Sequence, residues 1–300
     1  MKTILLTGAT GFLGSHICQR LIDLGYIIYA TYRSSSSFER CQSFISNVSW
    51  INVDKEEVNN FLSDVNLDIL IHVAWAGVSV EGRNNWDLQL KNFEFSRRVF
   101  DIAVQLGVKK IIGIGSQAEY GLFSQKVSED YLPEPHDAYG ATKLFTMHYL
   151  INLAKKENLN WYWIRVFSVV GEKENSGWLL SLVRNKLAQN ETIDLTEGEQ
   201  SYDYLYINDF LDRFEKLLNT NKDLSGIYNI CSGKEVKIKD LLLLLTEKMG
   251  VNKNNLKFGK IPYRRNQNMF MVGNPHKFEV NFGKFPLETL ESLIDKIVKA

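Results

Sequence analysis

The sequence has few cysteines, no net charge and no long apolar run, and each shortage narrows the classes of protein it can belong to. Cys18, Cys41 and Cys231 are odd in number and widely spaced, which argues against a disulfide framework or a metal cluster and favours a reducing cytoplasm. The 35 basic and 35 acidic residues leave no net field to attract nucleic acid or an anionic membrane. The apolar run 241–245 is far below the roughly 20 residues of a membrane span. We therefore expect a cytoplasmic protein with a small-molecule partner, whose anionic ligands must be held by local charges.

Apolar runs alternate with amphipathic stretches through the first half of the chain, which is the rhythm of a parallel, doubly wound α/β sheet of the Rossmann type. The runs are almost continuously apolar, as expected for strands covered on both faces. The predicted strands are residues 3–6, 27–31, 50–53, 69–74, 110–115, 161–167, 204–207 and 227–230. The predicted helices are residues 12–24, 55–65, 87–106, 138–157, 178–188, 237–249 and 287–298, with one more from Asn208.

The pattern loosens after Gly171, which predicts a second, smaller lobe. Residues 1–170, joined by about 206–235, are predicted to form the dinucleotide-binding domain. Residues 171–205 and 236–300 are predicted to form an α+β substrate-binding lobe. In open α/β sheets the ligand binds outside the carboxyl ends of the strands, so we expect the lobe to lie there.

A glycine-rich turn at residues 7–14 follows the first predicted strand and opens the first helix. This order makes a dinucleotide cradle, because Gly8, Gly11 and Gly14 let the backbone approach a pyrophosphate at the positive end of the helix. A glycine pattern alone can also be only a tight turn. The other predicted cofactor contacts are Thr10, Phe12, Leu13, Val53, Ala74, Trp75 and Phe167.

The end of the second predicted strand carries an arginine where NAD-selective sites carry an acid. A carboxylate about 20 residues beyond the turn would bind the ribose 2′-hydroxyl, but the segment here reads T-Y-R-S-S at 31–35. An arginine fork and hydroxyls suit a 2′-phosphate, so Arg33 and Ser34 predict NADP(H) over NAD. Alternatively, Arg33 is only a solvated loop residue. Asp54 is placed to accept from the adenine amino group or to cap the next helix.

Tyr139 and Lys143 lie four residues apart on a predicted helix, and therefore on one helical face. A tyrosine with a pKa of about 10 must be tuned for proton transfer near neutrality. One positive charge about 4 Å away can lower that pKa by roughly 3 units. We therefore predict that Lys143 tunes Tyr139, and that Ser116, at the end of a strand, holds a carbonyl oxygen of the substrate. The pair could also be only a helix face, but the upstream cradle favours catalysis.

At these motifs the chain resembles an extended short-chain dehydrogenase/reductase, and most of all the NAD(P)-dependent nucleotide-sugar epimerases, dehydratases and reductases. The resemblance covers essentially the whole length. Its marks are T-G-A-T-G-F-L-G at 7–14, H-V-A at 72–74, S-Q-A-E-Y-G at 116–121, Y-G-A-T-K at 139–143, R-V-F-S-V-V-G at 165–171, Y-D-Y-L-Y-I-N-D at 202–209 and the region of Asn229.

Departures from the family pattern restrict the reaction that the resemblance implies. The 4,6-dehydratases carry an Asp-Glu pair after the catalytic Ser/Thr, where this chain has Gln117 and Ala118. Enzymes that resemble GDP-fucose synthase have, besides the catalytic Ser, Tyr and Lys, a Cys and a His that epimerise the neighbouring carbons. This chain has Ala118 and Lys173 at the matching positions. Neither pair here can do that work, so dehydration and combined epimerisation are not expected. Hydride transfer at one carbon and 4-epimerisation remain.

A preference for NADPH favours net reduction, because the family's 4-epimerases usually hold and recycle NAD. Residues 258–272 are also similar to reductases of CDP- or dTDP-linked 4-keto-6-deoxyhexoses. The hypothesis is therefore NADPH-dependent reduction of such a ketone at C4, as in deoxysugar or surface-polysaccharide synthesis. The alternatives are a nucleotide-sugar 4-epimerase, an idle NADP-sensing protein and a reductase of non-nucleotide ketones.

The resemblance also directs attention to a sugar-nucleotide site and a dimer. The family usually has an arginine where this chain has Tyr202, so Arg264, with Arg265 as second candidate, is expected to neutralise the diphosphate. The remaining substrate candidates are Gln117, Ser168, Asn175, Trp178, Arg184 and Tyr202, and for the aromatic ones lobe packing is the alternative. Related enzymes often form homodimers through the helices that match 87–106 and 138–157.

Overall fold

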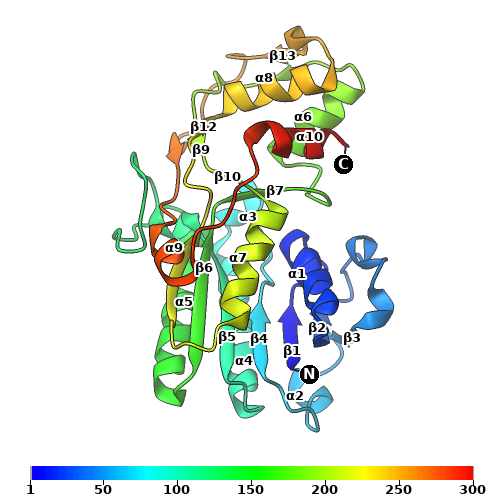
Figure 1. The fold of residues 1–300 in the computed structure, drawn as a ribbon, viewed down its shortest axis with the longest axis vertical. Helices are drawn as coiled ribbons and strands as arrows, with labels where there is room; N and C mark the ends of the chain where they lie inside the picture. Colours follow the sequence, from blue (N-terminus) through cyan, green and yellow to red (C-terminus); the bar gives the residue numbers. More distant parts are fainter. Residues whose placement is uncertain (1, 300) are drawn as a thin grey trace. The chain divides into compact units, whose positions relative to one another are not determined.

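A seven-stranded sheet forms the centre of the first of two units in the computed structural model, which describes residues 2–299 (Figure 1). The strand order is β11-β6-β5-β4-β1-β2-β3, and the strands from β1 to β6 pair in parallel. The order reverses between β1 and β4, as in a doubly wound sheet, so the predicted fold class is confirmed. The strands are β1 (Thr3–Thr7), β2 (Ile27–Tyr32), β3 (Ser49–Asn52), β4 (Ile69–His72), β5 (Lys110–Ser116), β6 (Asn160–Val166) and β11 (Gly226–Ile230).

Helices cover both faces of this sheet. Side chains alternate along β1, so Leu5 joins the core of one face and its neighbours Ile4 and Leu6 point to the other. The core on the first face joins Leu5 to Phe100 of α4 and Leu150 of α5. The helices of this unit are α1 (Phe12–Asp23), α2 (Val58–Phe61), α3 (Val80–Arg83), α4 (Trp86–Gln105), α5 (Ala138–Glu157) and the part of α7 (Ile207–Asn219) that begins at Phe214.

The second unit contains Leu122–Tyr131, Phe167–Arg213 and the chain from Asn229 onward. Its helices α6, α8 and α10 pack against one another (Figure 1). Strand β7 pairs with β10, β8 pairs with β13, and a small sheet has the order β12-β9-β14. The elements are β7 (Ser168–Val170), α6 (Leu179–Ala188), β8 (Ile193–Asp194), β9 (Ser201–Tyr202), β10 (Tyr204–Tyr206), β12 (Val236–Lys237), α8 (Ile238–Met249), β13 (Leu256–Lys257), β14 (Phe270–Met271), α9 (His276–Phe282) and α10 (Leu290–Lys299).

The borders of the units differ from those expected at 170, 206 and 235. Leu122–Tyr131 falls in the second unit because Val127 donates to Val272 and accepts from the Asn229 amide. The chain after Tyr228 also belongs there, because the carboxylate of Asp203 accepts the backbone N–H groups of Ser232 and Gly233 at 2.7 and 2.8 Å. These hydrogen bonds join segments that lie far apart in the sequence, so no local sequence pattern predicts them.

Most predicted elements occur within a few residues of their expected bounds, and the differences lie in short segments. The helix expected at 55–65 is only Val58–Phe61, and the one expected at 287–298 begins at Leu290. Two short helices, α3 and α9, were not predicted. Among the described residues, no helix combines the length and the apolar character that crossing a bilayer requires.

Candidate active site

The turn after β1 has the backbone geometry of a phosphate cradle. Gly8 has a φ of +75°, and a Cβ there would lie 2.6 Å from the backbone nitrogen of Ala74. A Cβ on Gly14 would lie 2.0 Å from the carbonyl oxygen of Gly8. No side chain caps the N terminus of α1 and no acid lies in its first turn, so its positive end is available to an anion.

A chain of hydrogen bonds ties β1 to β4 beside this cradle. The Thr7 hydroxyl accepts the N–H groups of Val73 and Ala74, each at 3.2 Å, so its proton is left for Nδ1 of His72 at 2.9 Å. Nε2 of His72 then donates to Ser96 at 2.8 Å. Burial lowers the pKa of His72 to about 3, which keeps the ring neutral in this role. The histidine of the H-V-A motif is therefore a structural link.

The loop after β2 carries the residues expected to select the cofactor. The backbone N–H of Arg33 donates to Ser36, and that of Ser34 donates to the carboxylate of Asp54 at 2.8 Å. Asp54 does not cap the next helix, because α2 starts only at Val58 with Glu57 as its N-cap. The alternative role considered for Asp54 is therefore wrong. Its carboxylate fixes the loop that bears Arg33.

Ser116 ends β5 and starts the 3₁₀ helix η3 (Gln117–Tyr120) through a capping box. Its hydroxyl accepts the N–H of Ala118 at 3.1 Å, and its own N–H donates to Glu119 at 2.8 Å. The indole of Trp163, which also donates to Glu119 at 2.9 Å, occupies the space above Gly115. A Cβ at Gly115 would lie 2.2 Å from the indole nitrogen, so glycine is required there.

Tyr139 stands in the first turn of α5, beside Ser116. The helix is capped by Asp137, whose carboxylate accepts the N–H of Gly140 at 2.7 Å. Burial raises the pKa of Tyr139, while the Arg83 guanidinium and a hydrogen bond from Ser116 act to lower it. The structure thus brings Ser116 and Tyr139 into contact. The cation closest to the tyrosine ring, Arg83, was not singled out from the sequence.

Lys143 lies on the same face of α5, but its nearest partners are others. Its Nζ donates to the carbonyl of Ile114 at 2.6 Å and lies 3.8 Å from the ring centroid of Trp75. It lies 6.0 Å from the ring centroid of Tyr139. Burial lowers the pKa of Lys143 to about 7, against the opposing effect of Glu119.

Trp75 connects α5 to the β4–α4 loop, and its place beside the cofactor stays a prediction. Its ring lies 6.1 Å from that of Tyr139 at 89°, and its indole nitrogen donates to Gln89 at 2.8 Å. Ala74 adjoins the cradle through its contact with Gly8. Among the other candidate cofactor contacts of the first unit, Phe12 and Gly14 are buried. The rest are half-buried, namely Thr10, Leu13 and Val53, or exposed, namely Gly11, Arg33, Ser34 and Asp54.

Two candidate substrate residues meet in the second unit. The Tyr202 hydroxyl donates to the Asn268 carbonyl at 2.9 Å and accepts from Gln267 at 2.8 Å, which lies in the same loop as Arg264. The charge of Arg264 acts on Tyr202, whose pKa is raised by burial. Arg264 and Arg265 are exposed, and no ion pair holds either of them within residues 2–299. A cationic, tyrosine-backed loop of this kind can bind an anion.

The other candidates of that unit have structural partners. Arg184 donates from Nη1 to the carbonyl of Ile297 at 3.0 Å, near the C terminus of α10, and its place at the phosphate stays a prediction. Asn175 accepts the N–H of Gly177 in the turn before α6, where Trp178 is the exposed N-cap residue. Phe167 is buried next to Gly273, and Ser168 begins β7. Gln117, in the first unit, is half-buried at the start of η3.

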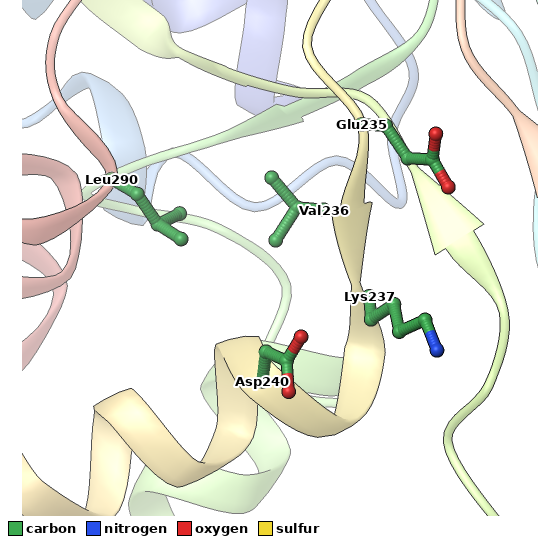
Figure 2. Close-up of a pocket in the computed structure, with 5 residues that line it drawn as sticks. All are labelled: Glu235, Val236, Lys237, Asp240 and Leu290. Carbon is green, nitrogen blue, oxygen red and sulfur yellow. The ribbon is translucent and has the colours of Figure 1, made fainter.

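A surface pocket of the second unit is lined by none of these candidate residues, although Val236 in its lining pairs with Tyr202. It has a volume of about 330 Å³ and is lined by Glu235, Val236, Lys237, Asp240 and Leu290. Figure 2 shows Val236 and Leu290 facing one space while the charged ends of Glu235 and Lys237 point away from it. The lining has no convergent polar groups, so the pocket is not a candidate active site.

The first unit as a whole fits a dinucleotide. The cradle at Gly8 and Gly14 admits no side chain, the end of α1 favours an anion, and the strand order reverses where the cradle lies. The side chains of Ser116, Tyr139 and Lys143 bring a hydroxyl, a phenol and an ammonium to the carboxyl-terminal side of the same sheet. These features define a dinucleotide-dependent enzyme of the Rossmann class.

Comparisons with known proteins agree with this class. The sequence pattern of the NAD dependent epimerase/dehydratase family matches residues 4–231. The chain is 25% identical over 244 residues to a dTDP-6-deoxy-L-talose 4-dehydrogenase (NAD(+)) of Aggregatibacter actinomycetemcomitans, covering 79% of this chain and 86% of that protein. It is 24% identical over 310 residues to a dTDP-4-dehydro-6-deoxyglucose reductase of Escherichia coli, covering 99% and 96%.

A solved structure matches the fold over nearly its full length. The UDP-glucuronic acid 4-epimerase of Bacillus cereus, in complex with UDP-glucuronic acid and NAD, has a TM-score of 0.89 and 22% identity, covering 99% of this chain and 98% of that one. The protein belongs to the NAD-dependent epimerase/dehydratase family. The family resemblance found in its motifs is thereby confirmed.

Proposed function

We propose that the protein reduces the C4 ketone of a nucleotide-linked 4-keto-6-deoxyhexose with NADPH. The observation that carries the proposal is the composition of the catalytic cluster. Ser116 contacts Tyr139, and Lys143 lies on the same helix face. The nearby carboxylate, Glu119, is held by Arg165 at 2.7 Å. A hydroxyl, a phenol and an ammonium without a free acid or base suit hydride transfer at one carbon and not elimination of water.

The protonation state of Tyr139 supports net reduction. A ketone that receives hydride needs a proton on its oxygen, and burial keeps the phenol protonated by raising its pKa. NADPH would supply the hydride. Ser116 would hold the ketone oxygen, Tyr139 would donate the proton to it, and buried Lys143 would hold the nicotinamide ribose. The relatives that act on dTDP-linked deoxysugars support this substrate class.

The loop around Arg33 supports NADPH, although the named solved relative holds NAD. The loop is fixed by its bonds to Ser36 and Asp54, so Arg33 is preplaced on the surface. We expect NADPH to bind more tightly than NADH, and Arg33→Ala to weaken NADPH binding by about tenfold or more, because charge-assisted hydrogen bonds contribute about 1.5–3 kcal/mol. Fluorescence titration with both cofactors measures this. Equal NADPH affinity in the variant, or tighter NADH binding by the wild type, contradicts the assignment.

The diphosphate is assigned to Arg264, with Arg265 as second candidate, supported by their exposure and by the loop that Tyr202 anchors. Ser168, Asn175, Trp178 and Gln117 stay predictions for the sugar or base.

We also propose a cytoplasmic homodimer through α4 and α5, on which Trp86, Leu90 and Phe145 are exposed. Sedimentation of the native protein as a monomer would contradict the dimer.

Incubation with NADPH and a panel of dTDP-, CDP- and UDP-linked 4-keto-6-deoxyhexoses tests the reaction. We expect NADPH absorbance to fall only with the nucleotide-linked ketone, and the product to be the 4-hydroxy sugar by NMR. Free hexoses and simple ketones serve as controls. Interconversion of C4 epimers without added cofactor would establish the 4-epimerase instead. No oxidation of NADPH with any member of the panel would overturn the reductase.

A further inference from the structure

The loop between β4 and α4 places a cation on the ring of Tyr139. The guanidinium carbon of Arg83 lies 4.5 Å from the ring centroid. Nε of Arg83 donates to Oδ2 of Asp137 at 2.8 Å, while the other oxygen of Asp137 caps α5. The side chain of Asp137 is 9% exposed and that of Arg83 is 28% exposed. The cation is therefore anchored at one edge and stacked on the aromatic face, which is a favourable arrangement for arginine.

The fold fixes this loop before any ligand binds. The amide of Gln89 donates to the carbonyls of Gly77 and Gly82 at 3.0 and 2.8 Å, and Asn92 donates to the carbonyl of Ala76 at 2.9 Å. A Cβ at Gly82 would lie 2.5 Å from the Cα of Gly77, so the two loop segments touch closely. The short helix α3, which ends at Arg83, packs against α4 and α5. The guanidinium is thus held in place by α4 as well as by Asp137.

Charged groups from several elements surround Tyr139. Lys143 lies on α5 and Asp137 is the N-cap of that helix, while η3 contributes Glu119 and β5 contributes the neutral hydroxyl of Ser116. The two carboxylates oppose a negative phenol oxygen. Lys143 is 6.0 Å from the ring centroid and engaged by Ile114 and Trp75. Of the two cations Arg83 and Lys143, Arg83 lies closer to the ring centroid, and its charge acts to lower the pKa of Tyr139.

We propose that Arg83 is a positioning residue for proton transfer by Tyr139, holding the ring in place and stabilising the phenolate that forms. This proposal rests on the proposed function of Tyr139 as proton donor. In the reduction, the O–H bond of Tyr139 breaks as the new O–H bond of the product alcohol forms, and the electron pair stays on the phenol oxygen. NADPH would supply the hydride. A positive charge about 4–6 Å from an acid commonly lowers its pKa by about 1–3 units.

The test compares Arg83→Met with Arg83→Lys, because methionine keeps much of the packing and lysine also keeps the charge. Protein labelled with 13C at the tyrosine ζ carbon is titrated by NMR, and the Tyr139 signal is identified by its loss in Tyr139→Phe. We expect the Tyr139 pKa to rise by about one unit or more in Arg83→Met and by less in Arg83→Lys. An Arg98→Met variant is the matched control, because Arg98 forms an exposed ion pair with Glu57 at 3.0 Å on α4.

Kinetics supply the second readout. Tyr139 must be protonated to donate, so the rate falls above its pKa. Loss of Arg83 should therefore move the alkaline limb of the kcat profile to higher pH, while the plateau falls about tenfold or more and the Kd for NADPH stays unchanged. A purely structural defect would lower the plateau without moving the limb. An unchanged Tyr139 pKa in Arg83→Met overturns the proposal. The NMR titration decides this even if no nucleotide sugar is turned over, so the two proposals fail separately.

Discussion

Replacing Tyr139 by phenylalanine should lower kcat by about 10²–10⁴-fold, the range that a positioned general acid contributes. The substitution removes only the hydroxyl, which contacts Ser116, and keeps the ring that stacks with Arg83 and adjoins Trp75. The fold and the cofactor cradle are therefore expected to survive. Single-turnover reduction with bound NADPH measures the chemical step directly, and a parallel titration should give an unchanged Kd for NADPH.

Tyr149→Phe is the matched control for this variant. Tyr149 lies on the same helix, and its hydroxyl donates to Asp101 at 2.5 Å in a partly buried site. Losing that hydrogen bond should lower stability by about 1 kcal/mol and leave kcat near the wild-type value. Equal loss of activity in both variants would mean that any change in α5 disturbs the site. Full activity in Tyr139→Phe would remove the phenol from the mechanism and with it the proposed reaction.

Helix α5 shows how far sequence alone could predict the candidate site. Its bounds, 138–157, were predicted correctly, because Asp137 is a strong N-cap and Asn158 ends the helix in the left-handed conformation. A spacing of four residues then places Tyr139 and Lys143 on one face. The glycine turn was equally readable, since a positive φ at Gly8 and its contact with Ala74 demand glycine. These features depend on residues that are close together in the sequence.

Arg83 could not be found in this way, because its position depends on contacts between distant segments. It ends a four-residue helix that carries no periodic signal, and its partner Asp137 is 54 residues away. The hydrogen bonds of Gln89 and Asn92 to the loop, together with Asp137, determine where its guanidinium goes. The direction taken by Lys143, toward Ile114 and Trp75, likewise depends on tertiary packing. Spacing identifies which side chains share a face, but not which charge from another element meets them.

The buried ion pair between Glu119 and Arg165 should have the largest effect on stability. Oε2 of Glu119 accepts from Nε of Arg165 at 2.7 Å, and the two side chains are 0% and 1% exposed. Oε1 accepts from the backbone of Ser116 and the indole of Trp163. Removing one partner of such a pair leaves an uncompensated buried charge, which costs about 3–5 kcal/mol. Glu119→Gln should therefore lower the free energy of unfolding by about that amount.

The same substitution should disturb catalysis, because Glu119 forms the capping box that orients Ser116. Urea unfolding at pH 7 measures the stability, and Glu57→Gln is the control, since that carboxylate forms an exposed ion pair with Arg98 and should change stability by less than about 1 kcal/mol. Adding Arg165→Met to Glu119→Gln should recover part of the loss by removing the unpaired charge. It should not restore kcat, because Ser116 and Trp163 would still face the weaker amide acceptor. A Glu119→Gln variant as stable as Glu57→Gln would show that the buried ion pair does not stabilise the fold.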